Sequence, residues 1–126
     1  MPVNIPPGVR KILEKTRKEL QKNYRERLKE MILFGSYARG NFVEGSDIDI
    51  LLLLEHIEDA AAERDRYFPV ISEISLEYDT VVSIVPVDFQ EFQEKRTPLI
   101  LNVHKEGKEL INAVNAYIVE VKESVS

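Results

Sequence analysis

Two aspartates one residue apart, Asp47 and Asp49, begin an apolar run and are the first candidates for chemistry. In a strand, alternate side chains point to the same face, so both carboxylates would lie together and could chelate one ion. Mg²⁺ prefers carboxylate oxygens and shares its shell with water and phosphate, which an open Asp-x-Asp pair permits. Two carboxylates without a cation repel each other and would need a basic partner, for which Arg39 is the local candidate. We interpret the pair as a metal site; the alternative is a solvated or capping pair.

Gly35 and Ser36 lie ten residues before this pair, where another apolar segment ends. Glycine permits a turn in which the backbone approaches a ligand closely, while backbone amides and the Ser36 hydroxyl face outward. If Ser36 or Tyr37 begins a short helix, the unpaired amides of its first turn would add to an anion site. Arg39 could then neutralise phosphate charge as pyrophosphate leaves. Together with the aspartate pair, this segment predicts a site for a metal-bound triphosphate.

Hydrophobic spacing predicts the elements that must position these residues. Apolar residues three and four apart predict a helix from about Pro7 to Tyr24, and apolar runs predict strands over 29–34 and 47–55. The unbroken apolar stretch 50–54 indicates a strand buried on both faces, as at the centre of a sheet. Helical spacing recurs over 57–78, where Tyr67 and Phe68 are expected in the core. Pro69 is expected to bend or restart that helix.

A third strand is expected over about 79–87, because β-branched residues dominate it. Two short helices should follow, one with Asp88 as its N-cap and one that begins at Thr97-Pro98 and runs to about His104. The tail 112–126 fits strand or helix. We therefore expect one α/β (α+β) domain over 1–126, with a small mixed sheet flanked by helices. Its parts would be an N-terminal helix at about 7–26, a core at about 28–110 and the tail.

Composition excludes several other kinds of protein. The chain has 126 residues, no cysteine and two histidines, so neither a disulfide framework nor a thiolate or His-rich metal cluster is expected. The N-terminus lacks the pattern of a signal peptide and no apolar run could span a bilayer, so we expect a cytoplasmic protein without membrane contact. The net charge of -5 argues against direct nucleic-acid binding.

The charge is unevenly distributed, because residues 10–29 hold nine Lys and Arg against three Glu. We interpret this basic segment as the solvated face of a helix; the alternative is a docking surface for an acidic partner or RNA.

Two stretches carry a family resemblance: Gly35-Ser36-Tyr37-Ala38-Arg39-Gly40 and Gly45-Ser46-Asp47-Ile48-Asp49. They resemble the signature of the DNA polymerase β-like nucleotidyltransferase superfamily. A chain this short resembles its minimal nucleotidyltransferases, the MNT antitoxins that are encoded beside HEPN-domain ribonuclease toxins. The resemblance covers roughly 28–110 and includes the stretch 102–107. It implies a polymerase β-like palm fold, nucleotide binding at Gly35, Ser36, Arg39 and Ser46, and two Mg²⁺ ions at Asp47 and Asp49.

The resemblance also implies a third carboxylate at the start of the next core strand. Glu77, Asp79 and Asp88 are the candidates. We choose Asp79 as a catalytic and metal-binding residue because it directly precedes the β-branched run 80–82. The alternative is a turn residue that binds no metal, in which case the domain could bind nucleotide yet transfer it poorly.

The implied activity is that of a metal-dependent protein adenylyltransferase. As an antitoxin, it would transfer AMP from ATP to a tyrosine of a cognate HEPN toxin, which would be both partner and substrate. A small-molecule (antibiotic) nucleotidyltransferase is disfavoured, because no second domain is evident to hold such an acceptor. A non-catalytic antitoxin that acts by binding alone is the other alternative, and the intact Gly-Ser and Asp-x-Asp residues count against it.

Overall fold

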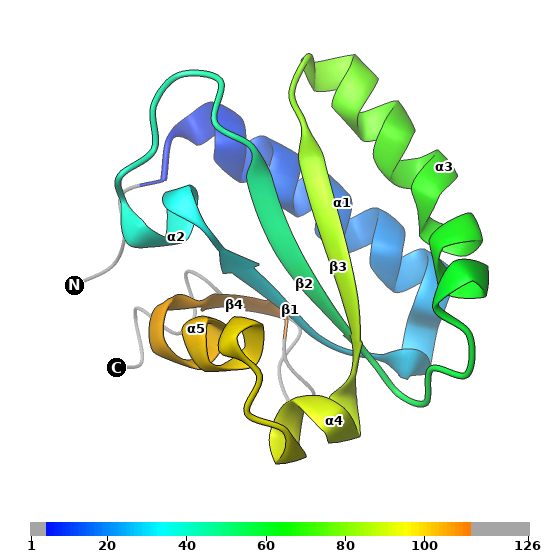
Figure 1. Ribbon diagram of the computed structural model, residues 1–126. Helices are drawn as coiled ribbons and strands as arrows, with labels where there is room; N and C mark the ends of the chain where they lie inside the picture. Colours follow the sequence, from blue (N-terminus) through cyan, green and yellow to red (C-terminus); the bar gives the residue numbers. More distant parts are fainter. Residues whose placement is uncertain (1–4, 112–126) are drawn as a thin grey trace.

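The computed structural model describes residues 5–111, which form a four-stranded mixed sheet with helices on both faces (Figure 1). The strand order is β3-β2-β1-β4, in which β2 is parallel to β3 and antiparallel to β1, and β4 is antiparallel to β1. The elements are α1 (Pro7–Tyr24), a 3₁₀ turn (Arg25–Arg27), β1 (Leu28–Phe34), α2 (Ser36–Arg39), β2 (Ile48–Leu54), α3 (Ala60–Tyr78), β3 (Val82–Asp88), α4 (Phe89–Glu94), α5 (Pro98–Glu106) and β4 (Lys108–Ile111). The expected fold class is confirmed, and the tail 112–126 lies outside the described residues.

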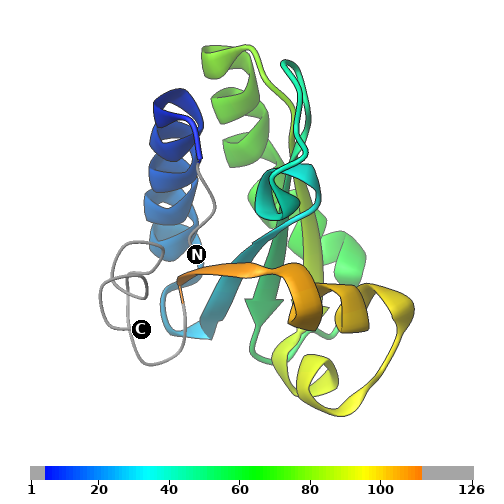
Figure 2. The same cartoon turned by 90° about the vertical axis from the view of Figure 1, so that its left-hand side faces the viewer.

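Strand β2 is the centre of the molecule and separates two hydrophobic clusters. Ile48, Ile50, Leu52 and Leu54 pack with residues of α1 and α3 on one face. Leu51 and Leu53 pack with α4 and α5 on the other face, and Figure 2 shows the two pairs of helices on opposite sides of the sheet. All six side chains are fully buried, as the unbroken apolar run predicts. Because side chains alternate along a strand, Asp49 lies on the α4/α5 face.

Helix α1 has the bounds that its spacing predicts. Its apolar face is buried, and the members of that face are Val9, Ile12, Leu13, Thr16, Leu20 and Tyr24. Beyond its end, Arg27 donates to the carboxylate of Glu63 in α3 over 2.6 Å and to the carbonyl oxygens of Glu55 and His56. This ion pair joins the N-terminal helix region to α3. In the described part of the chain, no helix is long and apolar enough to cross a membrane.

Helix α3 differs from its prediction in its start and in the exposure of Phe68, and of the two effects expected of Pro69, a bend or a restart, the restart does not occur. It begins at Ala60, capped by the Asp59 side chain, and continues through Pro69 without a restart. Pro69 is exposed, so water can solvate the carbonyl group that its missing N–H leaves unpaired. Phe68 is not a core residue, because its side chain is 52% exposed.

Strand β3 begins at Val82, three residues later than the composition predicts. The preceding helix uses those residues for its ending. Asp79 is the C-cap of α3 in the left-handed conformation (φ 49°, ψ 50°), and the Thr80 amide donates to the carbonyl oxygen of Ser75 over 3.0 Å. Aspartate is among the few residues other than glycine that tolerate this conformation, so Asp79 suits this turn.

Candidate active site

The turn between β1 and α2 lies directly against the aspartate pair. Gly35 has φ +75° and ψ -155°, a conformation that residues with a Cβ rarely adopt. A Cβ at this position would also overlap the carboxylate of Asp49. Helix α2 then begins at Ser36, as expected, and the amides of Ala38 and Arg39 donate to the Gly35 carbonyl oxygen over 3.1 and 3.0 Å. The close approach of backbone and carboxylate therefore requires glycine.

The loop from Gly40 to Asp47 brings the chain back to the start of β2. Ser46 closes this loop, because its hydroxyl accepts from the Val43 amide over 2.9 Å and its amide donates to the Val43 carbonyl oxygen over 3.0 Å. Gly40 and Gly45 have positive φ values, which allow the reversals at its two ends. Ser46 thus holds Asp47 in place beside β2.

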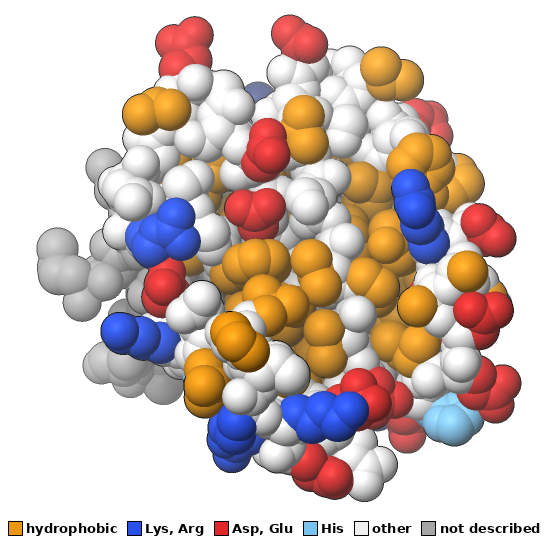
Figure 3. Space-filling model, viewed as in Figure 1, with side chains coloured by type: hydrophobic (Ala, Val, Ile, Leu, Met, Phe, Trp, Pro, Cys, Tyr) orange, Lys and Arg blue, Asp and Glu red, His pale blue; other side chains and the backbone are white. Residues whose placement is uncertain are grey.

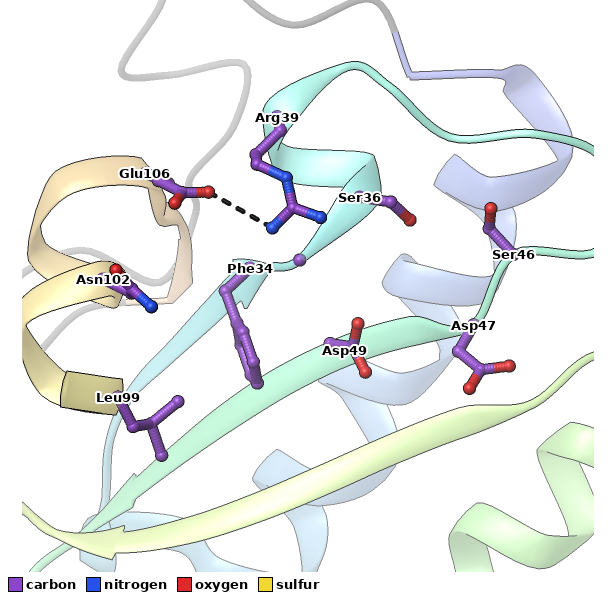
Figure 4. A pocket seen from close by; sticks show the side chains of 10 residues that line it. Phe34, Ser36, Arg39, Ser46, Asp47, Asp49, Leu99, Asn102 and Glu106 are labelled. Atoms are coloured by element: carbon purple, nitrogen blue, oxygen red, sulfur yellow. Dashed lines mark hydrogen bonds and ion pairs between the residues drawn. The ribbon is translucent and has the colours of Figure 1, made fainter.

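A cavity of about 440 Å³ lies between this turn, the loop and helix α5. It is lined by residues of β1, the Gly35 turn, α2, the loop before β2, β2 and α5, namely Phe34, Gly35, Ser36, Arg39, Ser46, Asp47, Asp49, Leu99, Asn102 and Glu106. Figure 4 shows Ser36 and Arg39 on one wall and the two aspartates on the other. On the face seen in Figure 3, acidic side chains lie at the centre with a basic side chain beside them and an apolar area below. The structure thus brings together Gly35, Ser36, Arg39, Ser46, Asp47 and Asp49.

The electrostatics of the two aspartates favour a cation. Burial raises the pKa of the Asp49 carboxyl above its usual value, and the nearby charge of Asp47 raises it further, while Arg39 opposes both effects. Asp47 is exposed and Asp49 is half-buried. A divalent cation between them would remove the repulsion, and both can share it with phosphate oxygens in the open cavity. The residues present therefore fit one cation that is shared with a phosphate group.

Helix α5 supplies one wall of the cavity that the sequence did not identify as part of a site. Leu99, Asn102 and Glu106 are three and four residues apart on the helix and therefore lie on one face. Glu106 and the guanidinium of Arg39 form an ion pair of 3.4 Å across the cavity mouth (Figure 4). The helical spacing of these residues was the available signal. It does not reveal which element the helix faces.

The proposed third carboxylate is not in this cavity. Asp79 is exposed in the turn after α3 and does not line the cavity, and Glu77 is exposed on α3 itself. Asp88 caps α4 and accepts from the Ile57 amide over 3.0 Å. Among the side chains that the structure describes, no group of three or more His, Cys, Asp or Glu residues is placed to hold a metal ion.

Comparisons with known proteins agree on one family. The family model described as "Nucleotidyltransferase domain" matches residues 13–114. Two proteins of Methanocaldococcus jannaschii are each 35% identical to the chain. "Putative protein adenylyltransferase MJ0141" matches over 57% of this chain and 72% of its own length, and "Putative protein adenylyltransferase MJ0604" over 72% and 86%. A chain in the crystal structure of a toxin-antitoxin with AMP-PNP has the same fold, with a TM-score of 0.57 at 22% identity over 89% of this chain and 88% of that chain.

Proposed function

The chain belongs to the nucleotidyltransferase domain family, and we propose that it transfers AMP from ATP to a hydroxyl group of a partner protein. The partner that we propose is a HEPN-domain toxin, and the acceptor is one of its tyrosines. The protein would then act as the antitoxin, because the attached AMP would inactivate the toxin.

One observation supports this activity above the others: the Gly35–Ser36 turn and the Asp47–Asp49 pair line opposite walls of one cavity. A volume of about 440 Å³ is within the range of small-molecule sites. One wall offers backbone amides, a hydroxyl and a guanidinium, which suit phosphate oxygens. The other wall offers two carboxylates, which suit the cation that accompanies a triphosphate.

The phosphate-binding wall and the cation-binding wall together suggest how the reaction would proceed. The acceptor oxygen would form a bond to the α-phosphorus, the bond from that phosphorus to the bridging oxygen would break, and pyrophosphate would leave as the acceptor loses its proton. Ser36 and the turn amides would hold the triphosphate, and Arg39 would exchange Glu106 for a phosphate oxygen. Mg²⁺ held by Asp47 and Asp49 would neutralise phosphate charge. The remaining contribution of the protein is to position the two reactants.

The nature of the acceptor rests on the relatives. The two proteins from Methanocaldococcus jannaschii are named as protein adenylyltransferases, and their matches cover most of their own lengths. A toxin-antitoxin structure with AMP-PNP contains the same fold. Both observations favour a protein acceptor and an adenine nucleotide.

The experiment is a transfer assay read by intact mass. The purified chain is mixed with Mg²⁺, each of the four nucleoside triphosphates and the protein that is encoded beside it. The proposal expects an added nucleotide on that protein, with ATP as the preferred donor. Omission of Mg²⁺ and the double substitution Asp47→Asn with Asp49→Asn should each abolish the addition.

The outcome with the double variant decides the role of the carboxylates, because asparagine keeps their shape and removes their charge. Addition at the wild-type rate by this variant would contradict the proposed mechanism. A wild-type chain that neutralises its partner without adding mass would instead support antitoxin action by binding alone.

A further inference from the structure

Strand β3 pairs with β2, so residues of β3 are the neighbours of Asp49 on that side of the site. In the parallel register of β2 and β3, Asp49 is the partner of Ser83. One step earlier, Ile48 is the partner of Val82, and the Ile48 amide donates to the Val81 carbonyl oxygen over 2.9 Å. Strand β3 is at the edge of the sheet, so no further strand follows it on that side among the described residues.

The face on which Ser83 lies follows from its neighbours. Val85 and Val87 pack against the α4/α5 cluster, whereas Val82 and Ile84 belong to the α1/α3 cluster. Because side chains alternate along a strand, Ser83 shares its face with Val85 and Val87 and thus with Asp49. Partner residues of neighbouring strands have side chains about 5 Å apart. Ser83 is half-buried; it borders a separate cavity between α3 and β3 and is not among the residues that line the site cavity itself. A carboxylate at this position would lie beside that of Asp49.

Three other described carboxylates are candidates near the site, and none of them lies on β3 beside Asp49. Asp79 lies in the exposed turn after α3 and does not line the cavity, and Asp88 accepts three backbone N–H groups, from Ile57, Gln90 and Glu91. Glu106 lines the cavity from α5, on the side of Arg39, and does not come from β3. The aspartate pair therefore has no third acidic neighbour from β3.

We infer that this site holds one divalent cation with its nucleotide, and that Ser83 occupies the position from which a carboxylate would bind a second. The inference rests on the proposed function, because it concerns the cation that the aspartate pair would share with a triphosphate. Two divalent ions about 4 Å apart carry four positive charges and need anionic ligands on both sides. The pair provides two negative charges, the phosphates bind on the side of Ser36, and the side towards β3 has a neutral hydroxyl.

The inference also bears on the acceptor. With no carboxylate on the described part of β3 beside Asp49, this strand provides no anionic group to accept the proton of the attacking hydroxyl. The acceptor hydroxyl would lose its proton to water, to a group of the acceptor protein or to Glu106 of α5 once Arg39 has turned to phosphate. The reaction would thus depend more strongly on the acceptor than it would at a site with three carboxylates.

The test counts bound ions. The chain is mixed with an equal amount of a non-hydrolysable ATP analogue and titrated with Mn²⁺, and free Mn²⁺ is measured by electron paramagnetic resonance. We expect one bound Mn²⁺ per complex for the wild type and two for Ser83→Asp. Ser83→Asn is the matched control, because it has the size of aspartate without its charge, and it should bind one.

Two bound ions in the wild-type complex would overturn the inference, whether or not any variant folds. One bound ion in Ser83→Asp would also overturn it, provided that thermal unfolding shows the variant to be folded. The analogue alone also binds Mn²⁺, so the same titration without protein gives the background, and equilibrium dialysis measures binding of the analogue to the chain. A wild-type chain that does not bind the analogue would contradict the proposed function itself. The two measurements together separate the failure of this inference from the failure of the proposed function.

Discussion

Gly35 is required both by the backbone conformation of the turn and by the contact of that turn with the Asp49 carboxylate. Its positive φ and its approach to Asp49 both depend on the absence of a Cβ. We predict that Gly35→Ala displaces the Asp49 carboxylate or the turn, and weakens binding of Mg²⁺ and ATP by more than about tenfold, or about 1.4 kcal/mol. Isothermal titration calorimetry with a non-hydrolysable analogue measures the change.

Gly40→Ala is the matched control for this substitution. Gly40 also has a positive φ, of 85°, but a Cβ there would meet no atom within 4 Å. Its cost should be limited to strain of about 1 kcal/mol in stability, with nucleotide affinity largely preserved. Equal losses of affinity in both variants would show that backbone strain, and not the contact with Asp49, explains the requirement for glycine.

Asp79 and Asp49 should respond differently to the same substitution. Asp79 is exposed in a left-handed cap, a conformation that asparagine also adopts, so Asp79→Asn should leave the transfer rate within about twofold of wild type. It should also stabilise the fold by up to about 1 kcal/mol, because a negative charge at a helix C-terminus is unfavourable. Asp49→Asn should lower the rate by about two orders of magnitude. A rate that falls by about two orders of magnitude in Asp79→Asn would show that Asp79 takes part in catalysis.

Part of the site is readable from residue types alone, and part is not. The Gly-Ser turn and the Asp-x-Asp pair combine unusual backbone freedom with like charge at close spacing, and both line the cavity. Asp79 is a candidate because it directly precedes the β-branched run in the sequence. In the structure, α3 ends with Asp79 in the left-handed conformation and β3 begins only at Val82, which position along the chain does not reveal.

At the scale of elements, Asp88 joins three segments. One carboxylate oxygen caps α4 through the Gln90 and Glu91 amides, and the other accepts from the Ile57 amide before α3. The Ile57 amide, followed by the two α4 amides, holds the pKa of Asp88 below its usual value. These hydrogen bonds therefore stabilise the fold fully above about pH 4, and the contribution is lost as the pH falls through the lowered pKa.

Asp88→Asn tests this coupling. The amide oxygen can still cap α4, but the amide nitrogen would then face the Ile57 N–H. We predict a loss of about 1–2 kcal/mol in the free energy of unfolding at pH 7. Urea denaturation should show the difference from wild type shrinking as the pH is lowered from 5 to about 2. A constant difference across that range would contradict the assigned hydrogen bonds.

The ion pair between Arg27 and Glu63 is the second element-scale contact with a testable value. The Glu63 side chain is 9% exposed, so Arg27→Ala would leave a nearly buried charge without its partner. We predict a loss of about 2–3 kcal/mol, and a partial recovery when Glu63→Gln is added. Lys95→Ala is the control, because its pair with Glu91 is exposed at both ends and should contribute less than about 0.5 kcal/mol. Thermal unfolding measures all of these variants.

Most helices and strands could be predicted because their signals are local. Helix α1 has the periodicity of a buried face, β2 has the apolar run of a central strand, and Asp88 and Thr97 are N-caps before short helices. What could not be predicted depends on tertiary contact. Glu106 meets Arg39 only because the fold places the end of α5 across the cavity from α2, 67 residues away along the chain.

In the molecule as a whole, the two faces of the sheet have different roles: one is covered by α1 and α3, and the other carries the candidate site. Helices α1 and α3 bury one face, and the cavity lies on the other face, at the end of β2 that carries Asp49. The three site segments come from different parts of the chain, 34–39, 46–49 and 99–106. The fold is thus needed to assemble a site whose individual motifs are only a few residues long.

A crystal structure of the chain with Mg²⁺ and a non-hydrolysable ATP analogue would test the proposed site directly. We expect the triphosphate against Ser36 and the Gly35 turn, with a cation on Asp47 and Asp49 and Arg39 turned from Glu106 towards phosphate. Nucleotide in the separate cavity beside β3, which Tyr67 and Ser83 line, would contradict it. So would a triphosphate bound without any cation at the aspartate pair.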